Sequence, residues 1–547
     1  MRSKFGILVF GAAPAALLAM AMATILGLGS CKKDFVSINT DPDHIAAASM
    51  NYAYLFTSAQ LITSGNSDGN AYEDWRNNLI YSGCMIQHLS STTPYWDGDK
   101  YLYNAGYNSA YWDNNYPNTI TNIVEVVTHL RTDTVAQGNF YNIARIFKAF
   151  MFQRMTDMYG DCPYSQAGLG EISGISAPVY DRQQEIYVDL LHELSMAAAG
   201  LDTTAANTLN SADLLYGGDP REWKKFAYSE MVRIAMRMSK VDPTDAQRWV
   251  QAAVRGGVMT SNSDNAIIAH QDVANTPAPN GSGLVLTSLD PDAYRLSETF
   301  VNYLKRTGDP RLCYLATVCV NPSNGMDPGD TTFTHQLGQP NGYDAPGSGS
   351  AYDLVGAVNF PRVPAVAQSD SLTEYQNRYS VVNRYTFART TAPSFFLTYG
   401  ETELLLAEAA ERGWVTGVPA AAYYSNGVSA AMSQLSLQAG AGPSAAAISA
   451  YLSNNPYDPA DALEQINDQY WVASFMDENE SFANWRRSNY PVLTPVNYPG
   501  NVTNGTIPRR FTYPQGEAST NGTNYNSAVS NLNNGDKMTS RVWWDVQ

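Results

Sequence analysis

The feature that most constrains the fold is a series of amphipathic stretches with helical spacing, joined by short connections. In residues 140–158, apolar side chains such as Ile143, Phe147 and Phe150 recur every three or four positions, which places them on one face of an α-helix. The same pattern occurs in residues 120–130, 183–201, 223–238 and 402–411. Neighbouring helices with short connections predict stacked helical hairpins of the tetratricopeptide kind, although the chain has no strict repeat period.

Two regions depart from this pattern. Between residues 258 and 393, Gly, Asn, Asp, Pro and Ser become frequent, which predicts a loop-rich insertion with a few short strands. The tail, residues 488–547, is rich in Asn, Thr, Gly and Tyr and poor in helix formers. We therefore predict a mainly α-helical single domain over residues 44–547, with its helical scaffold in 44–257 and 394–487.

The N-terminus has the features of a secretory signal. Arg2 and Lys4 precede a run without charge from Phe5 to Ser30. A positive start, an apolar middle and a small-residue end are typical of a cleaved leader. The alternative is an uncleaved membrane helix, because the run is long enough to span a bilayer. Pro14 and the abundance of Gly and Ala favour the leader.

Leu28-Gly29-Ser30-Cys31 closes this run and resembles the lipobox of bacterial lipoproteins, in which the cysteine is lipidated and becomes the new N-terminus. We expect a signal peptide over residues 1–30, a lipidated tether over 31–43, and anchoring by acyl chains such as palmitate on Cys31. Removal of the two leader cations changes the net charge from −17 to −19. Such an acidic chain does not track a phosphate backbone, which argues against nucleic acid as a partner.

The strongest candidate for a ligand surface is a group of aromatic residues in a short non-helical stretch. Tyr95, Trp96, Tyr101 and Tyr103 lie within nine positions, and Tyr107 follows. Aromatic rings can stack on the apolar faces of pyranose units, and apolar surface left bare in water usually signals a binding role. Trp96 ranks first among these candidates. The alternative is that the rings pack under the loop as additional core.

The loop-rich insertion supplies further candidates. They are Tyr343, Asp344 and Tyr352, chosen because loops often carry binding residues. Trp75 and Trp112 instead lie where helices begin or continue, so we expect them in the core.

Motifs for catalysis or cofactor binding are absent from the sequence. It has no glycine-rich phosphate loop before a helix, no HExxH and no spaced Cys/His set, so we predict no catalytic residue, no cofactor and no metal. An acidic pair such as Asp327 and Asp330 could help to hold Ca²⁺, but the neighbouring Pro and Gly favour turns. Cys313 and Cys319 are either a disulfide pair or buried free thiols.

A family resemblance is carried by seven segments in a fixed order. They are DMYGDCPYSQA at 157–167, PVYDRQQEIY at 178–187, DPREWKKFA at 219–227 running into RIAMRMSK at 233–240, YGETELLLAEAAERG at 399–413, WRRSNYP at 485–491, IPRRFTYP at 507–514 and WWD at 543–545. Together they resemble the SusD/RagB family of outer-membrane nutrient-binding lipoproteins of Bacteroidetes. The resemblance extends over nearly all of the chain after the leader.

The resemblance implies a SusD-like fold on a tetratricopeptide-like scaffold, in a surface-exposed lipoprotein of the outer membrane. It also implies a partner, a SusC-like TonB-dependent transporter, to which the protein delivers a bound nutrient. An oligo- or polysaccharide is the expected ligand, and a peptide, as in the RagB branch, is the first alternative. A surface glycoside hydrolase and a purely structural lid are the others, although we expect a binding protein and not an enzyme.

Two arginine pairs, Arg486-Arg487 and Arg509-Arg510, lie within these segments. Guanidinium contacts to carboxylates or carbonyls would hold the tail on the scaffold, and we favour this role over ligand binding. One departure from the family pattern is Ala227-Tyr228-Ser229, which stands where Ala-Asn-Ser is expected. It puts one interhelical hydrogen bond in doubt.

Overall fold

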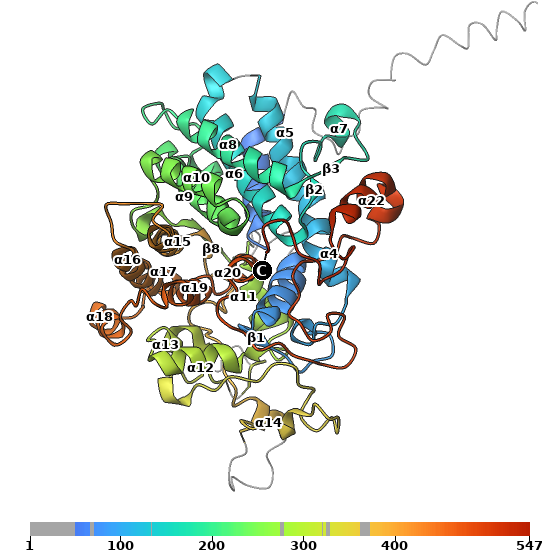
Figure 1. Ribbon diagram of the computed structural model, residues 1–547, viewed down its shortest axis with the longest axis vertical. Coiled ribbons are helices and arrows are strands. Elements are labelled where there is room, and N and C mark those ends of the chain that lie inside the picture. The colour runs from blue at the N-terminus through green and yellow to red at the C-terminus, as the bar shows by residue number, and fades with distance from the viewer. Residues whose placement is uncertain are drawn as a thin grey trace, which may run out of the picture. The chain divides into compact units, whose positions relative to one another are not determined.

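The computed structural model describes residues 50–65, 71–132, 134–273, 278–319, 321–323, 329–361 and 372–546. The leader, Cys31 and the tether predicted over 31–43 lie outside these residues. The chain divides into a short N-terminal unit, residues 1–52, and a main unit, residues 53–547. The main unit is mainly α-helical with short strands between the helices, which confirms the predicted fold class (Figure 1).

Helices of the first half pack against their neighbours in the chain. α5 (Thr121–Leu130) contacts α6 (Thr134–Tyr159), and α6 contacts α8 (Gln183–Ala199). α9 (Pro220–Arg237) contacts both α8 and α10 (Pro243–Gly256). α5, α6, α8 and α9 coincide with stretches in which the apolar periodicity predicted helices, so that signal located them correctly.

A second group of helices packs on the first. α15 (Tyr399–Glu411) lies against α9 and pairs with α16 (Ala420–Ser433), which contacts α18 (Ala445–Asn454). α19 (Ala462–Ala473) packs on α15, and α20 (Glu478–Ser488) contacts both α19 and α6. Figure 1 shows this group in brown and orange beside the green α9 and α10. The tertiary contacts of α20 thus join the two groups.

Local signals determine where the helices begin. Asp219 is the N-cap of α9: its side chain accepts a hydrogen bond from the Arg221 backbone N–H (2.9 Å), and Pro220 occupies the first turn. Thr398 and Glu401 form a capping box at the start of α15. Both arrangements satisfy backbone donors that a first helical turn leaves without partners.

The insertion has more regular structure than its composition predicts. Its helices are α11 (Gly281–Leu284), α12 (Glu298–Thr307), α13 (Leu312–Leu315) and α14 (Leu372–Gln376). Its antiparallel strand pairs are β4 (Ala266–Ile268) with β8 (Ser394–Leu397), β5 (Arg295–Leu296) with β1 (Leu89–Ser90), and β6 (Ala316–Thr317) with β7 (Val381–Val382). Ser297 caps α12 by accepting from the Thr299 backbone N–H, so a polar residue that reads as loop in fact starts a helix.

Shorter elements complete the main unit. They include α4 (Ala105–Asn114), α7 (Gly170–Ser173), α17 (Ser436–Ala439), and β2 (Cys162–Pro163) paired with β3 (Tyr180–Asp181). α3 (Tyr52–Thr63) begins at the boundary between the two units.

Three of the four paired arginines hold the tail on the scaffold, as predicted, whereas Arg487 pairs with Glu408 of α15 within the scaffold. Arg486 donates to the Arg509 carbonyl oxygen (Nη1–O 3.1 Å), and Arg510 donates to the Tyr159 carbonyl oxygen at the end of α6 (Nη2–O 2.9 Å). The tail also forms two short helices, α21 (Glu517–Thr520) and α22 (Gly522–Asn531). The tail therefore contains more helix than its polar composition predicts.

Tyr228, the departure from the family pattern, packs its ring against the end of α10. A Cβ added to Gly256 would lie 2.2 Å from that ring, so the glycine makes room for the tyrosine. Ser229 still accepts a hydrogen bond from the Met259 backbone N–H (2.9 Å). The contact between α9 and the segment after α10 is therefore kept.

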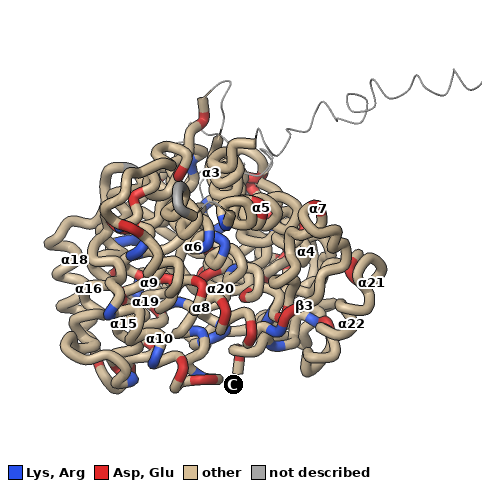
Figure 2. The backbone as a smooth tube through the Cα atoms, turned by 90° about the horizontal axis from the view of Figure 1, so that it is seen from above, with Lys and Arg blue, Asp and Glu red and all other residues tan. Residues whose placement is uncertain are grey.

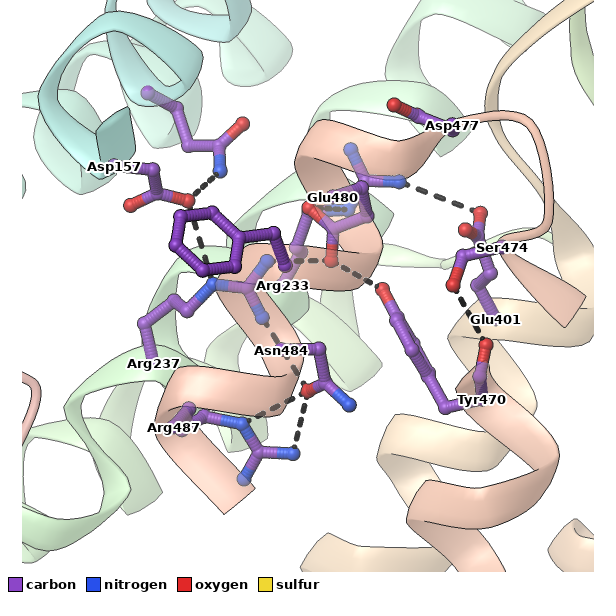
Figure 3. Close-up of polar contacts among 12 residues, drawn as sticks. Asp157, Arg233, Arg237, Glu401, Tyr470, Ser474, Asp477, Glu480, Asn484 and Arg487 are labelled. Carbon is purple, nitrogen blue, oxygen red and sulfur yellow. Dashed lines mark hydrogen bonds and ion pairs between the residues drawn. The ribbon is translucent and has the colours of Figure 1, made fainter. Parts of the chain in front are cut away.

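A network of buried charged side chains links α6, α9 and α20, and a tyrosine of α19 joins it by a hydrogen bond (Figure 3). Glu480 is at its centre: it pairs with Arg237, lies 3.7 Å from Arg233 and accepts a hydrogen bond from the Tyr470 hydroxyl (2.6 Å). Arg237 also lies 3.4 Å from Asp157 of α6. Because water reaches none of these charges, each depends on its partners for solvation.

Burial and pairing move the pKa values of the buried acids in opposite directions. Glu408 forms a bidentate ion pair with Arg487 (2.7 and 2.8 Å). Burial alone would raise the pKa of Glu408 and Glu480, but the neighbouring arginines outweigh it and hold both pKa values at about 2. Burial raises the pKa to about 7 at several other carboxyls, of which Asp74, Glu230 and Glu401 are three.

These shifts predict a stability maximum in mild acid. The two acids with a depressed pKa contribute stability above about pH 4.5 and lose it as the pH falls toward 2. The three with a raised pKa contribute stability below about pH 4 and lose it as the pH rises through 7. We expect the free energy of unfolding to be greatest near about pH 5 and lower at pH 8 by at least about 2 kcal/mol, since one pKa unit in one group corresponds to about 1.4 kcal/mol. Urea unfolding followed by tryptophan fluorescence measures this, and a stability that rises between pH 5 and 8 would contradict it.

Charge is sparse elsewhere in the described chain. Figure 2 shows acidic and basic residues interspersed along the backbone, and α16 and α18 contain neither. Within the described segments, every helix is too short or too polar to cross a bilayer.

Candidate functional site

The aromatic loop, residues 91–104, connects β1 to α4, and its backbone is held in place at Gly98 and at Asn104. Gly98 lies against the π-helix Asp74–Gly83, where an added Cβ would be 1.9 Å from the Ile80 carbonyl oxygen. Only glycine fits such a close approach of two backbones. Asn104 ends the loop by capping α4 with its side chain. Packing in the middle and capping at the end therefore position the aromatic side chains.

Trp96 is a core residue. It is fully buried, stacks on Tyr294 (5.9 Å between ring centroids) and donates from its indole Nε1–H to Asp290 Oδ2 (2.5 Å). The prediction that Trp96 leads an exposed stacking surface is therefore wrong. The physical reason is that Asp290 gives the indole a buried acceptor, which allows the whole ring to leave water.

Tyr101 is buried as well. Its hydroxyl oxygen accepts a hydrogen bond from the Val496 backbone N–H (3.2 Å), and its carbonyl oxygen accepts one from the Val502 N–H (3.0 Å). Burial raises the pKa of the Tyr101 phenol. Tyr101 thus attaches the tail to the aromatic loop, and its expected exposure to ligand is also corrected.

Tyr95 and Tyr103 are the exposed rings of the loop, with 45% and 41% of their surface accessible. The Tyr95 hydroxyl donates to Asp290 Oδ1 (2.6 Å), so one carboxylate holds both Tyr95 and Trp96. Burial raises the pKa of Asp290, and the hydrogen bonds from the two rings lower it in part. Tyr95 is thereby fixed at its hydroxyl while its ring stays accessible.

The backbone around Tyr103 is held by a residue that sequence reasoning missed. The Tyr81 hydroxyl donates to the Leu102 carbonyl oxygen (2.9 Å) and accepts from the Asn104 N–H (2.7 Å). Half-buried Tyr107 packs edge-on against Tyr81 (5.6 Å). Tyr107 therefore supports the loop from α4 and contributes less accessible surface than Tyr95 or Tyr103.

A second cluster surrounds Asp344. Its Oδ1 accepts a hydrogen bond from the Tyr498 hydroxyl (2.7 Å) and lies 3.3 Å from Lys100 Nζ, and its Oδ2 accepts from Ser350 (2.5 Å). Burial alone would raise the pKa of Asp344, but these hydrogen bonds and the Lys100 charge lower it. The ring of Tyr352 packs against Tyr498 (4.9 Å). Tyr498 was not among the predicted candidates, because nothing near it in the tail distinguishes it from other tyrosines.

The structure brings the two predicted candidate segments together. Asp99 Oδ2 accepts a hydrogen bond from the Gly342 N–H (3.1 Å), and Asn341 donates to the Leu89 carbonyl oxygen (2.8 Å). The aromatic loop and the Asp344 cluster thus share one region of the main unit. Half-buried Tyr343 instead packs on a small core formed by Leu354, Ala357, Phe360 and Tyr379.

Several further sequence predictions can be compared with the structure. Trp112 is buried, as expected, and Trp75 is half-buried. Cys313 and Cys319 do not form a disulfide with each other, so the disulfide alternative is wrong. Asp330 accepts from the Thr332 N–H (2.8 Å), the turn role that was favoured, while Asp327 lies outside the described residues. The described residues contain no cluster of three or more His, Cys, Asp or Glu side chains that could hold a metal ion.

Comparisons with known proteins agree with this architecture. A SusD-like family model, described as starch-binding and associating with the outer membrane, matches residues 47–514. A solved chitin-binding protein is 34% identical, with a TM-score of 0.77, and the match covers 91% of this chain and 100% of that one. A Bacteroidetes SusD-like protein is 26% identical, with a TM-score of 0.78 and the same coverage.

A more distant likeness supports the fold alone. A chitin-binding SusD homologue from Flavobacterium johnsoniae is 22% identical, with a TM-score of 0.72, and the match covers 91% of this chain and 99% of that one. No curated protein sequence matches the chain significantly. The family model spans most of the chain, and the chain therefore belongs to the SusD-like family, which is associated with the outer membrane.

Proposed function

We propose that the protein is a cell-surface lipoprotein, anchored through Cys31, that binds a chitin-type oligosaccharide and delivers it to a SusC-like TonB-dependent transporter. It carries the glycan without transforming it. Family membership supports the outer-membrane location. The 34% identity to a chitin-binding protein, over that protein's whole length, favours an N-acetylglucosamine polymer over starch.

The observation that carries this proposal is the state of Tyr95. Its ring is exposed while its hydroxyl is held by Asp290, so little side-chain freedom is lost when a sugar stacks on it. Tyr103 supplies a second exposed ring on the same loop. Asp344, with Tyr352 beside it, supplies oxygen acceptors for sugar hydroxyl groups in the same region.

The test is a binding titration of purified protein with chitohexaose. We expect Tyr95→Ala and Tyr103→Ala each to weaken binding about 5- to 30-fold, which corresponds to about 1–2 kcal/mol for an aromatic contact residue. Tyr385→Ala is the matched control, because Tyr385 is 48% exposed and lies outside the aromatic loop. Binding that neither loop variant weakens would remove this surface from the proposal.

The same titration separates the alternatives. Binding of maltohexaose in place of chitohexaose would make starch the cargo, and binding of a peptide library alone would favour the RagB-like function. Chromatography of the sugar after incubation tests for hydrolysis. Shorter products that depend on the protein would replace the carrier with a glycoside hydrolase.

A further inference from the structure

A second pocket lies outside the aromatic loop and the Asp344 cluster. Residues of α12, α19 and the segment after α20 line an open pocket of about 590 Å³ there, a volume typical of small-molecule sites. Tyr303 and Trp471 contribute its aromatic wall, and Pro491 and Val492 contribute an apolar rim. Val492 is 77% exposed, so its apolar surface is accessible at the rim.

The distinctive group in this pocket is Asp468. It lines the pocket and is only 8% exposed, and its Oδ1 has no hydrogen-bond partner among the described residues. Burial is the main cause that raises the pKa of Asp468, the nearby Glu464 adds to the rise and Arg306 opposes it, and together they bring the pKa to about 7. A buried carboxyl oxygen without a donor is costly for a folded protein.

The aromatic residues of the wall, by contrast, are satisfied within the protein. The Tyr303 hydroxyl accepts a hydrogen bond from Gln469 Nε2 (3.2 Å), and the Trp471 Nε1–H donates to the Ile86 carbonyl oxygen (3.2 Å). Asp468 is therefore the buried side chain of this wall whose hydrogen bonding is incomplete. A hydrogen-bond donor from outside the chain would complete it.

The charges around the pocket indicate the nature of that donor. Lys305 and Arg306 balance Glu464 and Asp468, so the lining residues have no net charge. Lys305 is moreover engaged with the Gln336 carbonyl oxygen (2.6 Å). Lys305 and Arg306 would repel a strongly cationic ligand, and Glu464 and Asp468 would repel a strongly anionic one. A neutral hydroxyl group would be repelled by neither pair.

We propose that this pocket is a second glycan site, which takes one sugar unit with a hydroxyl group donating to Asp468 and an apolar face against Val492. The inference rests on the proposed function, since it assumes that the cargo is a neutral glycan. Two sites on one protein would hold a polymer more tightly than either alone, provided that one chain can reach both.

The first experiment needs no sugar. We expect Asp468→Asn to raise the melting temperature at pH 8 by about 1–3 °C, because it removes a buried charge that has no donor in the unliganded protein. Asp461→Asn is the control, since it removes the same charge from an exposed position at the start of α19 and should leave the melting temperature unchanged. A lower melting temperature for Asp468→Asn would mean that the carboxyl stabilises the fold, and the inference would fail whatever the cargo is.

The second experiment is calorimetric titration with chitotriose. Asn302→Trp fills the pocket from an exposed position of α12 that also lines it, so the fold should not be disturbed. Wild type should bind two molecules per chain, Asn302→Trp one, and Asp468→Asn should lose at least tenfold in affinity at one site only. The Tyr95→Ala/Tyr103→Ala variant should retain the site at Asp468.

The outcomes separate this inference from the proposed function. A single site in wild type that is unaffected by Asn302→Trp but weakened by the tyrosine substitutions overturns the second site and leaves the proposed function intact. A single site that responds only to Asn302→Trp supports the pocket and removes the aromatic loop. Absence of chitotriose binding overturns both, and the melting temperature of Asp468→Asn then still reports independently on whether Asp468 is a structural group.

Discussion

Glu480→Leu is expected to lower the free energy of unfolding by about 3–5 kcal/mol, the range for breaking a buried ion pair by removing one partner. Glu480 faces both Arg237 and Arg233, and all three side chains are buried (Figure 3). Without this carboxylate, two guanidinium groups would remain inside the protein with less negative charge to compensate them. Arg237 would keep Asp157 at 3.4 Å as its nearest anion. Urea unfolding at pH 7 measures the loss.

The double variant Glu480→Leu/Arg237→Met provides the decisive comparison. Replacing both members of a buried pair by apolar side chains is often neutral, so the double variant should be more stable than Glu480→Leu alone. Arg182→Met is a suitable control, because Arg182 forms its ion pair with Asp161 at a largely exposed position. If Glu480→Leu lowered the free energy of unfolding by less than about 1 kcal/mol, the buried charge network would not depend on the Glu480 carboxylate for its stability.

Trp96→Ala is expected to cost about 3–5 kcal/mol of stability, as for other large aromatic residues removed from a core. The substitution would leave a cavity beside Tyr294 and remove a donor from Asp290 Oδ2. Because Asp290 also positions Tyr95, we expect glycan binding to weaken indirectly through the loop. Thermal unfolding and chitohexaose titration of the same preparation measure the two effects.

Trp96→Phe separates structure from ligand contact. Phenylalanine keeps a ring that can stack on Tyr294 but cannot donate to Asp290, so stability should fall by less than in Trp96→Ala. Tyr95→Ala gives the opposite profile, a loss of binding with little loss of stability, because its ring is nearly half exposed. A Trp96→Ala variant that is as stable as wild type but does not bind chitohexaose would restore the direct ligand role that burial argues against.

The aromatic loop illustrates how far sequence reasoning reached at the candidate site. It identified the ring-rich segment and included Tyr95 and Tyr103, whose rings are exposed. It ranked Trp96 above them because the partner of the indole, Asp290, is 194 positions away and sits among residues typical of a turn. The side-chain type predicts that a Tyr or Trp ring prefers a partly exposed position. Which ring is buried depends on where the fold supplies a hydrogen-bond acceptor in the interior.

In the Asp344 cluster, too, a partner that is distant in the sequence was missed. Loop composition pointed to Asp344 and Tyr352, but not to Tyr498, which is 154 positions from the aspartate it binds. The four arginines were easier to interpret, because fixed guanidinium donors in uncharged surroundings need carboxylate or carbonyl acceptors. Arg486 and Arg510 both use carbonyl oxygens for this purpose.

The sequence by itself determined where five helices of the scaffold lie, namely α5, α6, α8, α9 and α15. Apolar spacing and capping act between residues at most a few positions apart, as at Asp219 and Arg221, so they can be recognised before the chain is folded. Only the tertiary structure decided which aromatic rings face water and which acids keep their charge. Both properties depend on partners that folding brings together from distant parts of the chain, such as Tyr101 and Val496, 395 positions apart.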